Sequence, residues 1–514
     1  GLDSPSNSTH AVFFDYDRDQ DLDMILVNHN PKSLPVLDES STADLLNKPD
    51  ENSGIQFFVN PGQGGKFINQ TKALGIQSST LSYGLAVGIS DVNQDGWPDF
   101  YVSNDYTIPD YLYINQAGKS FVNTINSSIG HISHFSMGND IADVNNDLLP
   151  DIFTLDMLPE DNVRQKLLMS PDNYEKYDFN LKVGFGHQIM RNMLQLNLGQ
   201  NASGNTMFSE VGQLAGISNT DWSWSALFAD YDNDGWKDLY VTNGIRRDVN
   251  NKDFYNKHRL FFDKMKNDPN YKNKEEEFKL LSYLEKMPSE KLSNYLFQNK
   301  QNGGFENKNI EWGLDEKTFS NGLIYTDLDN DGDLDLVVNN LEDIASVYRN
   351  NSTNTNFIGF ELKGKDNEIP LGSRVHLKTD GGYQMQELSL SRGYLSSVSP
   401  RIHFGLGTST KIDEIIIQWP DGTQFKVENS KLNTYNRIVY NAQDVFPKDT
   451  KVEIDLKQFE TIIQKEPFVH DENLHNDFKD EVLLPHKNST LGPALAVGDL
   501  NNDKLEDYLI GGAI

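Results

Sequence analysis

LIYTDLDNDGDLDLVVNN, at residues 323–340, combines a short acidic motif with an apolar run on each side. Its carboxylates recur at the first, third, fifth and ninth positions of a loop, as Asp327, Asp329, Asp331 and Asp335. With Gly332 as a turn residue, these oxygens can surround a hard cation such as calcium. An EF-hand would need a glutamate at position twelve and flanking helices, but position twelve is Val338 and both flanks are typical of strands. The stretch therefore predicts a strand, a calcium loop and a second strand.

The same nine-residue pattern occurs six times, each time between two apolar runs. It reads DYDRDQDLD from Asp15, DVNQDGWPD from Asp91, DVNNDLLPD from Asp143, DYDNDGWKD from Asp230, DLDNDGDLD from Asp327 and DLNNDKLED from Asp499. Acidic turns that close hairpins without any metal would explain one copy as well as calcium does. Six copies in register favour calcium, so we expect several ions per chain.

In each copy we expect ligands from the side chains at positions one, three, five and nine and from the main-chain carbonyl at position seven. The predicted residues are Asp15, Asp17, Asp19, Asp21, Asp23, Asp91, Asn93, Asp95, Trp97, Asp99, Asp143, Asn145, Asp147, Leu149, Asp151, Asp230, Asp232, Asp234, Trp236, Asp238, Asp327, Asp329, Asp331, Asp333, Asp335, Asp499, Asn501, Asp503, Leu505 and Asp507. Position six is glycine in three loops but Gln20, Leu148 and Lys504 in the others, so full occupancy of those three is in doubt. The Asp143 loop is expected to empty first, because a left-handed leucine costs roughly 1 kcal/mol or more.

A second periodic element lies between the acidic loops. It is a short strand that ends in asparagine, at Asn60, Asn115, Asn197, Asn299 and Asn350. The first four of these asparagines precede the next acidic loop by 31, 28, 33 and 28 residues, whereas the preceding connection varies widely in length. The smallest repeat, about 52 residues with four strands, has the size of a propeller blade.

The long insertions all fall in the connection after the calcium hairpin. Because neighbouring strands are antiparallel, these insertions leave the blade at the face opposite the acidic loops. Binding residues tend to lie on loops carried by a rigid scaffold, so we expect partner contacts from residues 28–55, 156–190 and 245–295, or from the following domain. Residues 250–297 have helical spacing and predict a helical insertion that packs on the propeller rim.

At 514 residues the chain is expected to form two or three domains. Residues 1–352 contain the repeats and predict a β-propeller of about seven blades, partly outside this chain. Residues 353–445 alternate apolar and polar positions between turns and predict a β-sandwich. Residues 446–514 predict a linker and the start of a second propeller. The predicted fold class is therefore all-β, with helical insertions on one propeller face.

The composition limits the partners. The net charge of −31 argues against nucleic acid and anionic membranes, because both attract basic surfaces. The chain has no cysteine, which excludes disulfides, thiolate metal sites and cysteine nucleophiles. No apolar run is long enough to span a membrane. Calcium loops of this kind are best saturated outside a cell, where calcium is millimolar.

Other candidate sites are weaker. His131 and His134 fit ordinary polar packing better than a metal site. Arg246 and Arg247 are better explained as forming salt bridges at the base of an insertion than as contacting an acidic or sugar ligand. Four tryptophans could stack on sugars, but the two at position seven of acidic loops are expected to pack between blades.

The acidic loops with their flanking strands resemble FG-GAP/VCBS calcium repeats. The predicted sandwich resembles the ASPIC/UnbV domain in GSRV (372–375), RGYLSS (392–397), HFGLG (403–407) and the pair Trp419–Pro420. Together they are similar to the cartilage-acidic-protein-like family in its long Bacteroidota form. The resemblance covers nearly the whole chain. It implies an exported bacterial protein at the outer-membrane surface, whose long relatives often carry a lipid anchor.

We therefore expect a calcium-stabilised binding or scaffold protein that serves as an accessory component of an outer-membrane assembly or of glycan or protein capture. Its partner would be a protein or a glycan at the cell surface, and a lipid anchor or a partner outside this chain would supply any membrane association. The alternative is a glycan-active hydrolase or lyase on the insertion face of the propeller. That activity would require carboxylates that converge on this face.

Overall fold

The structure of the chain is a computed structural model. It describes residues 2–512 with gaps at 3–5, 33–34, 36, 63, 107, 171–172, 261–262, 264–280, 366, 445, 448–467, 482–483 and 485–486. The chain divides into two compact units, Gly1–Asp449 and Thr450–Ile514.

Five antiparallel sheets follow one another in the first unit, and each begins with the two strands that flank an acidic loop. The first two sheets contain β1 (Ser8–Phe14), β2 (Asp23–Asn28), β3 (Gln56–Val59) and β4 (Ile68–Asn69), then β5 (Gly84–Ser90), β6 (Asp99–Asn104), β7 (Tyr111–Asn115) and β8 (Phe121–Asn123). The third contains β10 (Asn139–Ala142), β11 (Asp151–Thr154), β13 (Met193–Gln200) and β14 (Thr206–Glu210). The last two contain β15 (Ser223–Ala229), β16 (Asp238–Asn243), β18 (Tyr295–Asn299) and β19 (Phe305–Asn307), then β21 (Ser320–Thr326), β22 (Asp335–Asn340) and β23 (Ser346–Tyr348).

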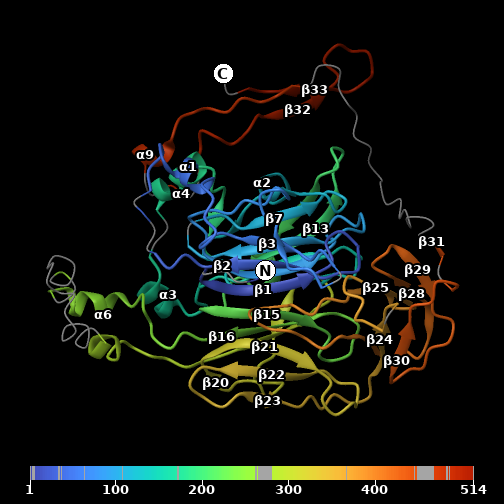
Figure 1. Ribbon diagram of the computed structural model, residues 1–514. Coiled ribbons are helices and arrows are strands. Elements are labelled where there is room, and N and C mark those ends of the chain that lie inside the picture. The colour runs from blue at the N-terminus through green and yellow to red at the C-terminus, as the bar shows by residue number, and fades with distance from the viewer. Residues whose placement is uncertain are drawn as a thin grey trace. The chain divides into compact units, whose positions relative to one another are not determined.

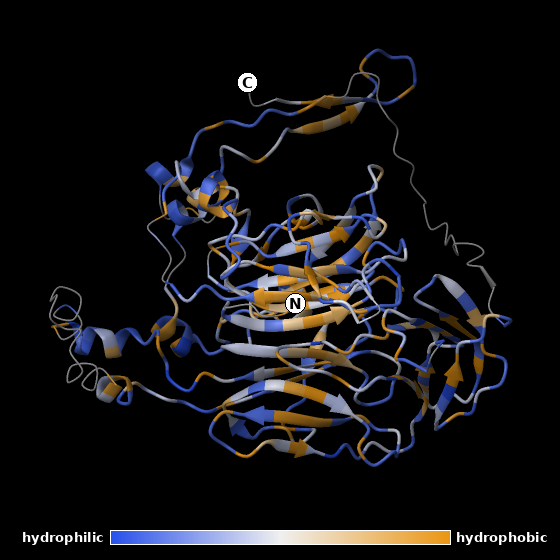
Figure 2. Cartoon of the chain, viewed as in Figure 1, coloured by the Kyte–Doolittle hydropathy of each residue, from blue (hydrophilic) through white to orange (hydrophobic). Residues whose placement is uncertain are grey.

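The sheets pack like propeller blades. Their first strands, β1, β5, β10, β15 and β21, contact one another in succession, and the blades lie side by side in Figure 1. The second strands β2, β6 and β16 are buried at every position. Aromatic side chains fill the space between blades, for example Phe57 and Phe100 in one cluster and Phe153 and Phe228 in another. Figure 2 shows the same concentration of apolar residues in the strands.

The connections after the second strands carry the helices α1 (Thr42–Leu46), α3 (Asn162–Leu168), α4 (Tyr174–Lys182) and α6 (Lys252–Lys257). Three of them begin with a side-chain cap from Asp161, Asn173 or Asn251. The shorter elements are α2 (Ile125–Ser128), α5 (Gly212–Ala215), β9 (Ile132–Ser133), β12 (Gln188–Ile189), β17 (Leu292–Ser293) and β20 (Lys317–Thr318). Much of the predicted helical insertion at 250–297 lies outside the described residues.

Two sheets follow the blades and enclose a core of their own, as expected for a sandwich. One contains β24 (Asn356–Lys363), β27 (Arg401–Gly407) and β30 (Tyr435–Val439). The other contains β25 (Arg374–Thr379), β26 (Gly382–Glu387), β28 (Ile412–Gln418), β29 (Thr423–Lys426) and β31 (Phe446–Pro447). Phe360, Ile417 and Trp419 are among the residues buried between them. In Figure 1 the labelled sandwich strands lie on one side of the blades, and helices α3 and α6 lie on the other.

The second unit contains α9 (Asp477–Asp480) and one hairpin, β32 (Leu495–Gly498) with β33 (Asp507–Ile510). The sixth acidic loop joins these two strands. The all-β class, with propeller blades and a sandwich, is therefore confirmed, and the total of about seven blades stays a prediction. Among the described residues, no helix has both the length and the apolar character needed to cross a membrane.

Candidate metal centres in the blade loops

All six acidic loops share one backbone conformation. Position six is left-handed in every copy, as the glycine of the pattern predicts, and it remains so where the residue is Gln20, Leu148 or Lys504. Position four is left-handed as well, with φ between 57° and 65°. The residues there are Arg18, Gln94, Asn146, Asn233, Asn330 and Asn502. The sequence analysis missed this second turn position, although asparagine in four of the six copies is a signal for it.

The two turns wrap the loop around the carboxylate at position one. In every copy this carboxylate accepts the backbone N–H of position six, at 2.8 to 3.1 Å. In the Asp91 loop this bond uses Oδ2, while Oδ1 is buried and has no hydrogen-bond partner in the described structure. A buried carboxylate oxygen without a partner is costly, so it fits a place for a cation.

The structure brings together many of the carboxylates that the sequence predicts as ligands. Three groups have acidic oxygens within 4.8 Å of one another: Asp15, Asp17 and Asp19; Asp230, Asp232 and Asp234; and Asp327, Asp329 and Asp335. These clusters could hold a metal ion. In two other loops position three is an asparagine whose amide donates to the carboxylate at position five, as Asn93 does to Asp95 and Asn145 to Asp147, both at 2.9 Å.

The aspartate at position nine has a bracing role in every blade. One of its oxygens accepts the backbone N–H of position two in the same loop. The other accepts the backbone N–H of the periodic asparagine that follows in the same blade. In the second blade Asp99 accepts Val92 N–H at 3.0 Å and Asn115 N–H at 2.8 Å. The corresponding bonds to the asparagine are 2.8 to 2.9 Å in the other four blades. Position nine therefore ties the acidic loop to the third strand.

The same asparagines connect neighbouring blades, which explains the second periodic element of the sequence. Four of the five side-chain amides donate to the carbonyl of position two in the acidic loop of the preceding blade. These bonds join Asn115 to Tyr16, Asn197 to Val92, Asn299 to Val144 and Asn350 to Tyr231, at 2.6 to 2.9 Å. One asparagine thus fixes two successive loops relative to each other.

The loop carboxylates are crowded and largely desolvated. Burial, together with the neighbouring carboxylates of Asp19 and Asp17, raises the pKa of Asp15 to about 6. Burial likewise raises the pKa of Asp23 to about 7 and that of Asp143 to about 6. A divalent cation would offset both the burial and the repulsion, and hard oxygen donors are what calcium prefers. The residues present therefore fit calcium.

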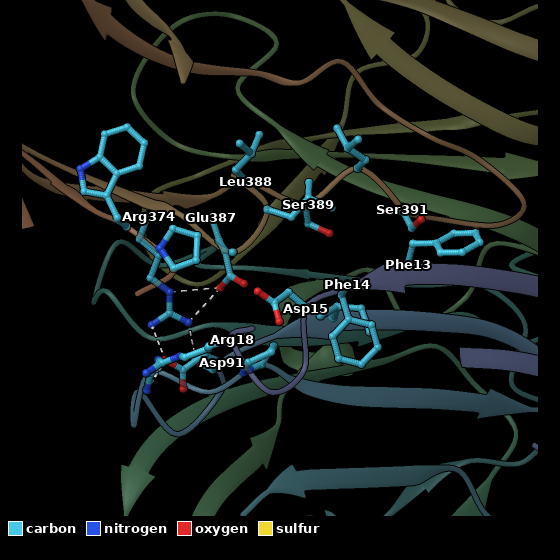
Figure 3. Close-up of a pocket in the computed structure, with 18 of the residues that line it drawn as sticks. Phe13, Phe14, Asp15, Arg18, Asp91, Arg374, Glu387, Leu388, Ser389 and Ser391 are labelled. Carbon is cyan, nitrogen blue, oxygen red and sulfur yellow. Dashed lines mark hydrogen bonds and ion pairs between the residues drawn. The ribbon is translucent and has the colours of Figure 1, made fainter. Parts of the chain in front are cut away.

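The β-sandwich covers part of the acidic-loop face. A cleft between the Asp15 and Asp91 loops and the sandwich encloses about 670 Å³ of space, counting the part open to solvent. Figure 3 shows Arg374 in this cleft, joined by dashed lines to Glu387 and to Asp91. Phe13 and Leu388 also line it. No local sequence pattern predicts this arrangement.

A buried arginine of the sandwich reaches the first strands of three blades. Arg392 binds the Asp140 carboxylate through Nε at 2.8 Å and Nη2 at 2.6 Å, and it also donates to the Phe228 carbonyl and the Tyr325 hydroxyl. Its side chain is only 9% exposed, and that of Asp140 is fully buried. The RGYLSS run (392–397) therefore locks the sandwich to β10, β15 and β21.

The weaker candidates have structural partners. His131 lies 3.2 Å from Glu210, and His134 stacks on Phe135. Arg246 forms an ion pair with Glu342 at 2.9 Å, as a salt-bridged loop base would.

The tryptophans differ in their surroundings. The Arg18 guanidinium of the first blade lies 4.2 Å from the ring centroid of Trp97 in the second, so this position-seven tryptophan packs between blades as expected. Trp224, in contrast, donates to the Gly244 carbonyl and packs near Tyr394 of the sandwich.

The fold and its loops define a propeller-type repeat protein with acidic loops that could hold metal ions and with an appended sandwich. A family model described as an FG-GAP-like repeat matches residues 91–154, and one described as ASPIC and UnbV matches residues 363–445. The chain therefore contains an FG-GAP-like repeat region and an ASPIC/UnbV domain, as the sequence resemblance implied.

The chain is similar to cartilage acidic protein 1. It is 31% identical to the Homo sapiens protein over 126 residues, which is 23% of this chain and 19% of that protein. It is 30% identical to the Xenopus tropicalis protein over 140 residues, or 26% of this chain and 22% of that protein. The matched region thus spans about a fifth of the length of these curated relatives.

Two solved structures show a remote likeness. One is a lectin from Agrocybe aegerita that recognises non-reducing terminal N-acetylglucosamine, with a TM-score of 0.31 and 12% identity over 68% of this chain and 67% of that chain. The other is the exotype rhamnogalacturonan lyase YesX, with a TM-score of 0.29 and 11% identity over 84% of this chain and 62% of that chain. At these TM-scores neither structure carries an argument about function.

Proposed function

We propose that this chain is a calcium-stabilised binding and scaffold protein that is exported and exposed at the cell surface. Its acidic loops bind several calcium ions, one in each well-formed loop. The ions hold the blades in register, and the loops and helices of the opposite face bind a protein or a glycan. The observation that carries this proposal is the repetition of one loop geometry, with crowded buried carboxylates, in every blade of the described structure.

The calcium chemistry supports a location outside the cytoplasm. Millimolar calcium would saturate loops of moderate affinity, and extracellular calcium modules work in this range. The strong acidity of the chain fits this setting, because bound calcium neutralises part of the charge. We place the protein at a bacterial outer-membrane surface, held by a lipid anchor or by a partner outside this chain.

The alternative, a glycan-active hydrolase or lyase, would use carboxylates on the insertion face. The buried carboxylates of Asp110 and Asp156 lie in the connections that leave at this face. Asp110 accepts hydrogen bonds from Tyr101, Asn104 and Ser136. Asp156 accepts four more, from the Ser133 hydroxyl and the backbone N–H groups of residues 134, 135 and 157. These bonds favour a bracing role for both groups.

Four measurements on one preparation test the proposal. Metal analysis after dialysis should find several calcium ions per chain, and a chelator should lower the melting temperature. Arrays of glycans and of surface proteins should show calcium-dependent binding. A parallel turnover screen with polysaccharides should show no product. A calcium-free chain whose melting ignores the chelator would contradict the metal role, and turnover would favour the enzyme.

A further inference from the structure

The β-sandwich contacts three acidic loops, those that begin at Asp91, Asp230 and Asp327. In the first two it contacts the position-one aspartate, and in the third it contacts positions four and six. In each case a different part of the sandwich supplies the contact, and the three contacts differ in chemistry. Such repetition is unlike a chance contact between two domains.

Arg374 of β25 makes the contact with the Asp91 loop. Its Nη1 lies 3.3 Å from Asp91 Oδ2, and its Nη2 donates to the Asp91 carbonyl at 2.5 Å. Glu387 holds the same guanidinium at 2.8 Å, so the charge is balanced and its position fixed (Figure 3). The Arg374 side chain is only 4% exposed. Because the arginine binds Oδ2, the unpartnered Oδ1 of Asp91 remains available for a cation.

Strand β27 makes the contact with the Asp230 loop. The Gly405 N–H donates to Asp230 Oδ2 at 3.1 Å, again on the oxygen that accepts the N–H of position six. Oδ1 of the position-four residue, Asn233, lies 2.7 Å from His403 Nε2, and the Asn233 backbone carbonyl accepts the Gly407 N–H at 2.7 Å. A Cβ on Gly405 would come within 2.1 Å of Asp230 Oδ2, so this close approach requires glycine.

Residues of β24 and β27 make the contact with the Asp327 loop. Arg401 Nη1 donates to Asn330 Oδ1, the position-four side chain, at 2.8 Å. The ring of Phe357 lies against Gly332 so closely that a Cβ there would meet it at 1.9 Å.

The Asp15 loop provides an internal comparison. The hydrogen bonds to its first carboxylate come from the N–H groups of Asp19 and Gln20, within the same loop. This loop nevertheless contains one of the three carboxylate groups. The chain therefore offers loops of one design with and without support from the sandwich.

We propose that the sandwich is part of the calcium-binding apparatus, with Arg374 and Gly405 positioning the first ligand of the Asp91 and Asp230 loops and Arg401 holding position four of the Asp327 loop. Residues behind metal ligands fix ligand orientation, and their loss usually lowers metal affinity by roughly ten- to a hundredfold. The coupling is reciprocal, since whatever docking adds to calcium affinity, calcium adds to docking. This inference rests on the proposed calcium role of the loops.

Hydrogen exchange followed by mass spectrometry can measure each loop separately in the full chain. The N–H of position six binds the first carboxylate, so its exchange reports on loop order. Titrating calcium while following peptides that cover residues 15–23, 91–99, 230–238 and 327–335 gives one calcium midpoint per loop. Arg374→Gln should raise the midpoint of the Asp91 loop roughly tenfold and leave the Asp15 loop unchanged. Arg374→Lys should recover part of the loss, because it restores the charge without the paired donors.

Arg401→Gln is an independent variant and should shift only the Asp327 loop, because it loses the bond to Asn330. Two exposed sandwich contacts supply matched controls: Arg437→Gln, which loses a bond to Asn367, and Tyr440→Phe, which loses a bond to Asp421. Neither control should move any midpoint. Unchanged midpoints in both Arg374→Gln and Arg401→Gln, with normal calcium responses in all loops, would overturn this inference alone. Loops that never respond to calcium in the unmodified chain would overturn the proposed calcium role as well.

Discussion

Leu148 occupies a backbone position that suits glycine. Its φ of 72° is left-handed, and the equivalent residues in the Asp230 and Asp327 loops are glycines with φ above 90°. A side chain in this conformation costs roughly 1–2 kcal/mol, because Cβ approaches the backbone. The loop nevertheless has the same hydrogen bonds as the others, so the rest of the blade supports the strain.

Leu148→Gly should therefore stabilise the chain by about 1 kcal/mol and raise the calcium affinity of the Asp143 loop. Urea unfolding with and without calcium measures the first effect, and loop-resolved hydrogen exchange measures the second. Leu149→Gly in the same loop is the control and should destabilise, because its backbone is not left-handed. A Leu148→Gly protein that is less stable than the parent would show that the apolar contacts of Leu148 outweigh the strain.

In the unmodified chain, we expect the Asp143 loop to lose calcium before the Asp230 loop as the calcium concentration is lowered.

Arg392 illustrates a buried charge held by several partners. Arg392→Met should lower the free energy of unfolding by roughly 3–5 kcal/mol, because it leaves the Asp140 carboxylate buried and uncompensated. The double variant Arg392→Met with Asp140→Asn should recover part of this loss, since the charge is gone and the amide oxygen can still accept Phe228 N–H. Urea unfolding of the four proteins in this cycle gives the coupling energy. Equal losses in the single and double variants would contradict this explanation.

At the scale of the element, the asparagine that ends each third strand determines how blades adjoin. Asn299→Ala should cost about 1–3 kcal/mol, because the carbonyls of Val144 and Lys237 lose their donor. Asn299→Asp should cost more than alanine at neutral pH, since a carboxylate would face two carbonyl oxygens. Asn60, whose amide has only the longer 3.3 Å bond to Leu22, should tolerate alanine better. Thermal or urea unfolding of the three variants ranks them.

His10 connects the first strands of two blades and makes their contact sensitive to pH. It is buried, and its Nδ1 accepts the Val87 N–H at 3.3 Å. Burial lowers its pKa from 6.5 to about 4. At pH values between about 4 and 6.5, His10 is therefore protonated in the unfolded chain but neutral in the folded chain. The free energy of unfolding consequently falls as the pH drops from about 6.5 towards 4.

This single group should account for a loss of up to roughly 3 kcal/mol over that interval. His10→Asn keeps an acceptor for Val87 N–H but does not titrate in this range. Urea unfolding at pH 7 and at pH 4.5 should therefore give a smaller drop for the variant than for the parent. If the two proteins lose the same stability on acidification, His10 does not titrate as proposed.

The elements show which features can be read from the sequence. The period of the acidic loops and asparagines predicts the blades, and the turn-bounded alternating segments predict the sandwich, because both patterns are local. The bond between Asn299 and Val144 was not predicted, since it joins segments 155 residues apart. The contact of Arg374 with Asp91 joins segments 283 residues apart, and nothing in either segment identifies the other. Local chemistry therefore predicted the loops, while their support by the sandwich required the structure.

In the first unit as a whole, the two faces of the blade array differ in what they contact. The acidic-loop face meets the sandwich through Arg374, Gly405 and Arg392. The other face carries the insertions, which are braced at their bases. Arg164 of α3 binds Asp221 at 2.6 Å and Glu290 at 2.8 Å, so it joins the third insertion to the end of the fourth. A loop anchored in this way can change in its outer part without disturbing the blades.

The last prediction separates these tasks. Replacing residues 260–281 by a short Gly/Ser linker keeps the Arg164 ion pairs and should leave the melting temperature nearly unchanged, because the exchange spares the blade strands. It should weaken binding to the partner found on the arrays. Asp327→Ala should do the reverse at low calcium, lowering the melting temperature first and binding only as a consequence, and saturating calcium should reduce its effect. Melting curves and binding isotherms on the two variants, each at low and high calcium, distinguish the faces. The opposite result would be a partner that binds the shortened variant normally but does not bind Asp327→Ala even when that variant is folded. Such a result would place binding on the acidic loops instead.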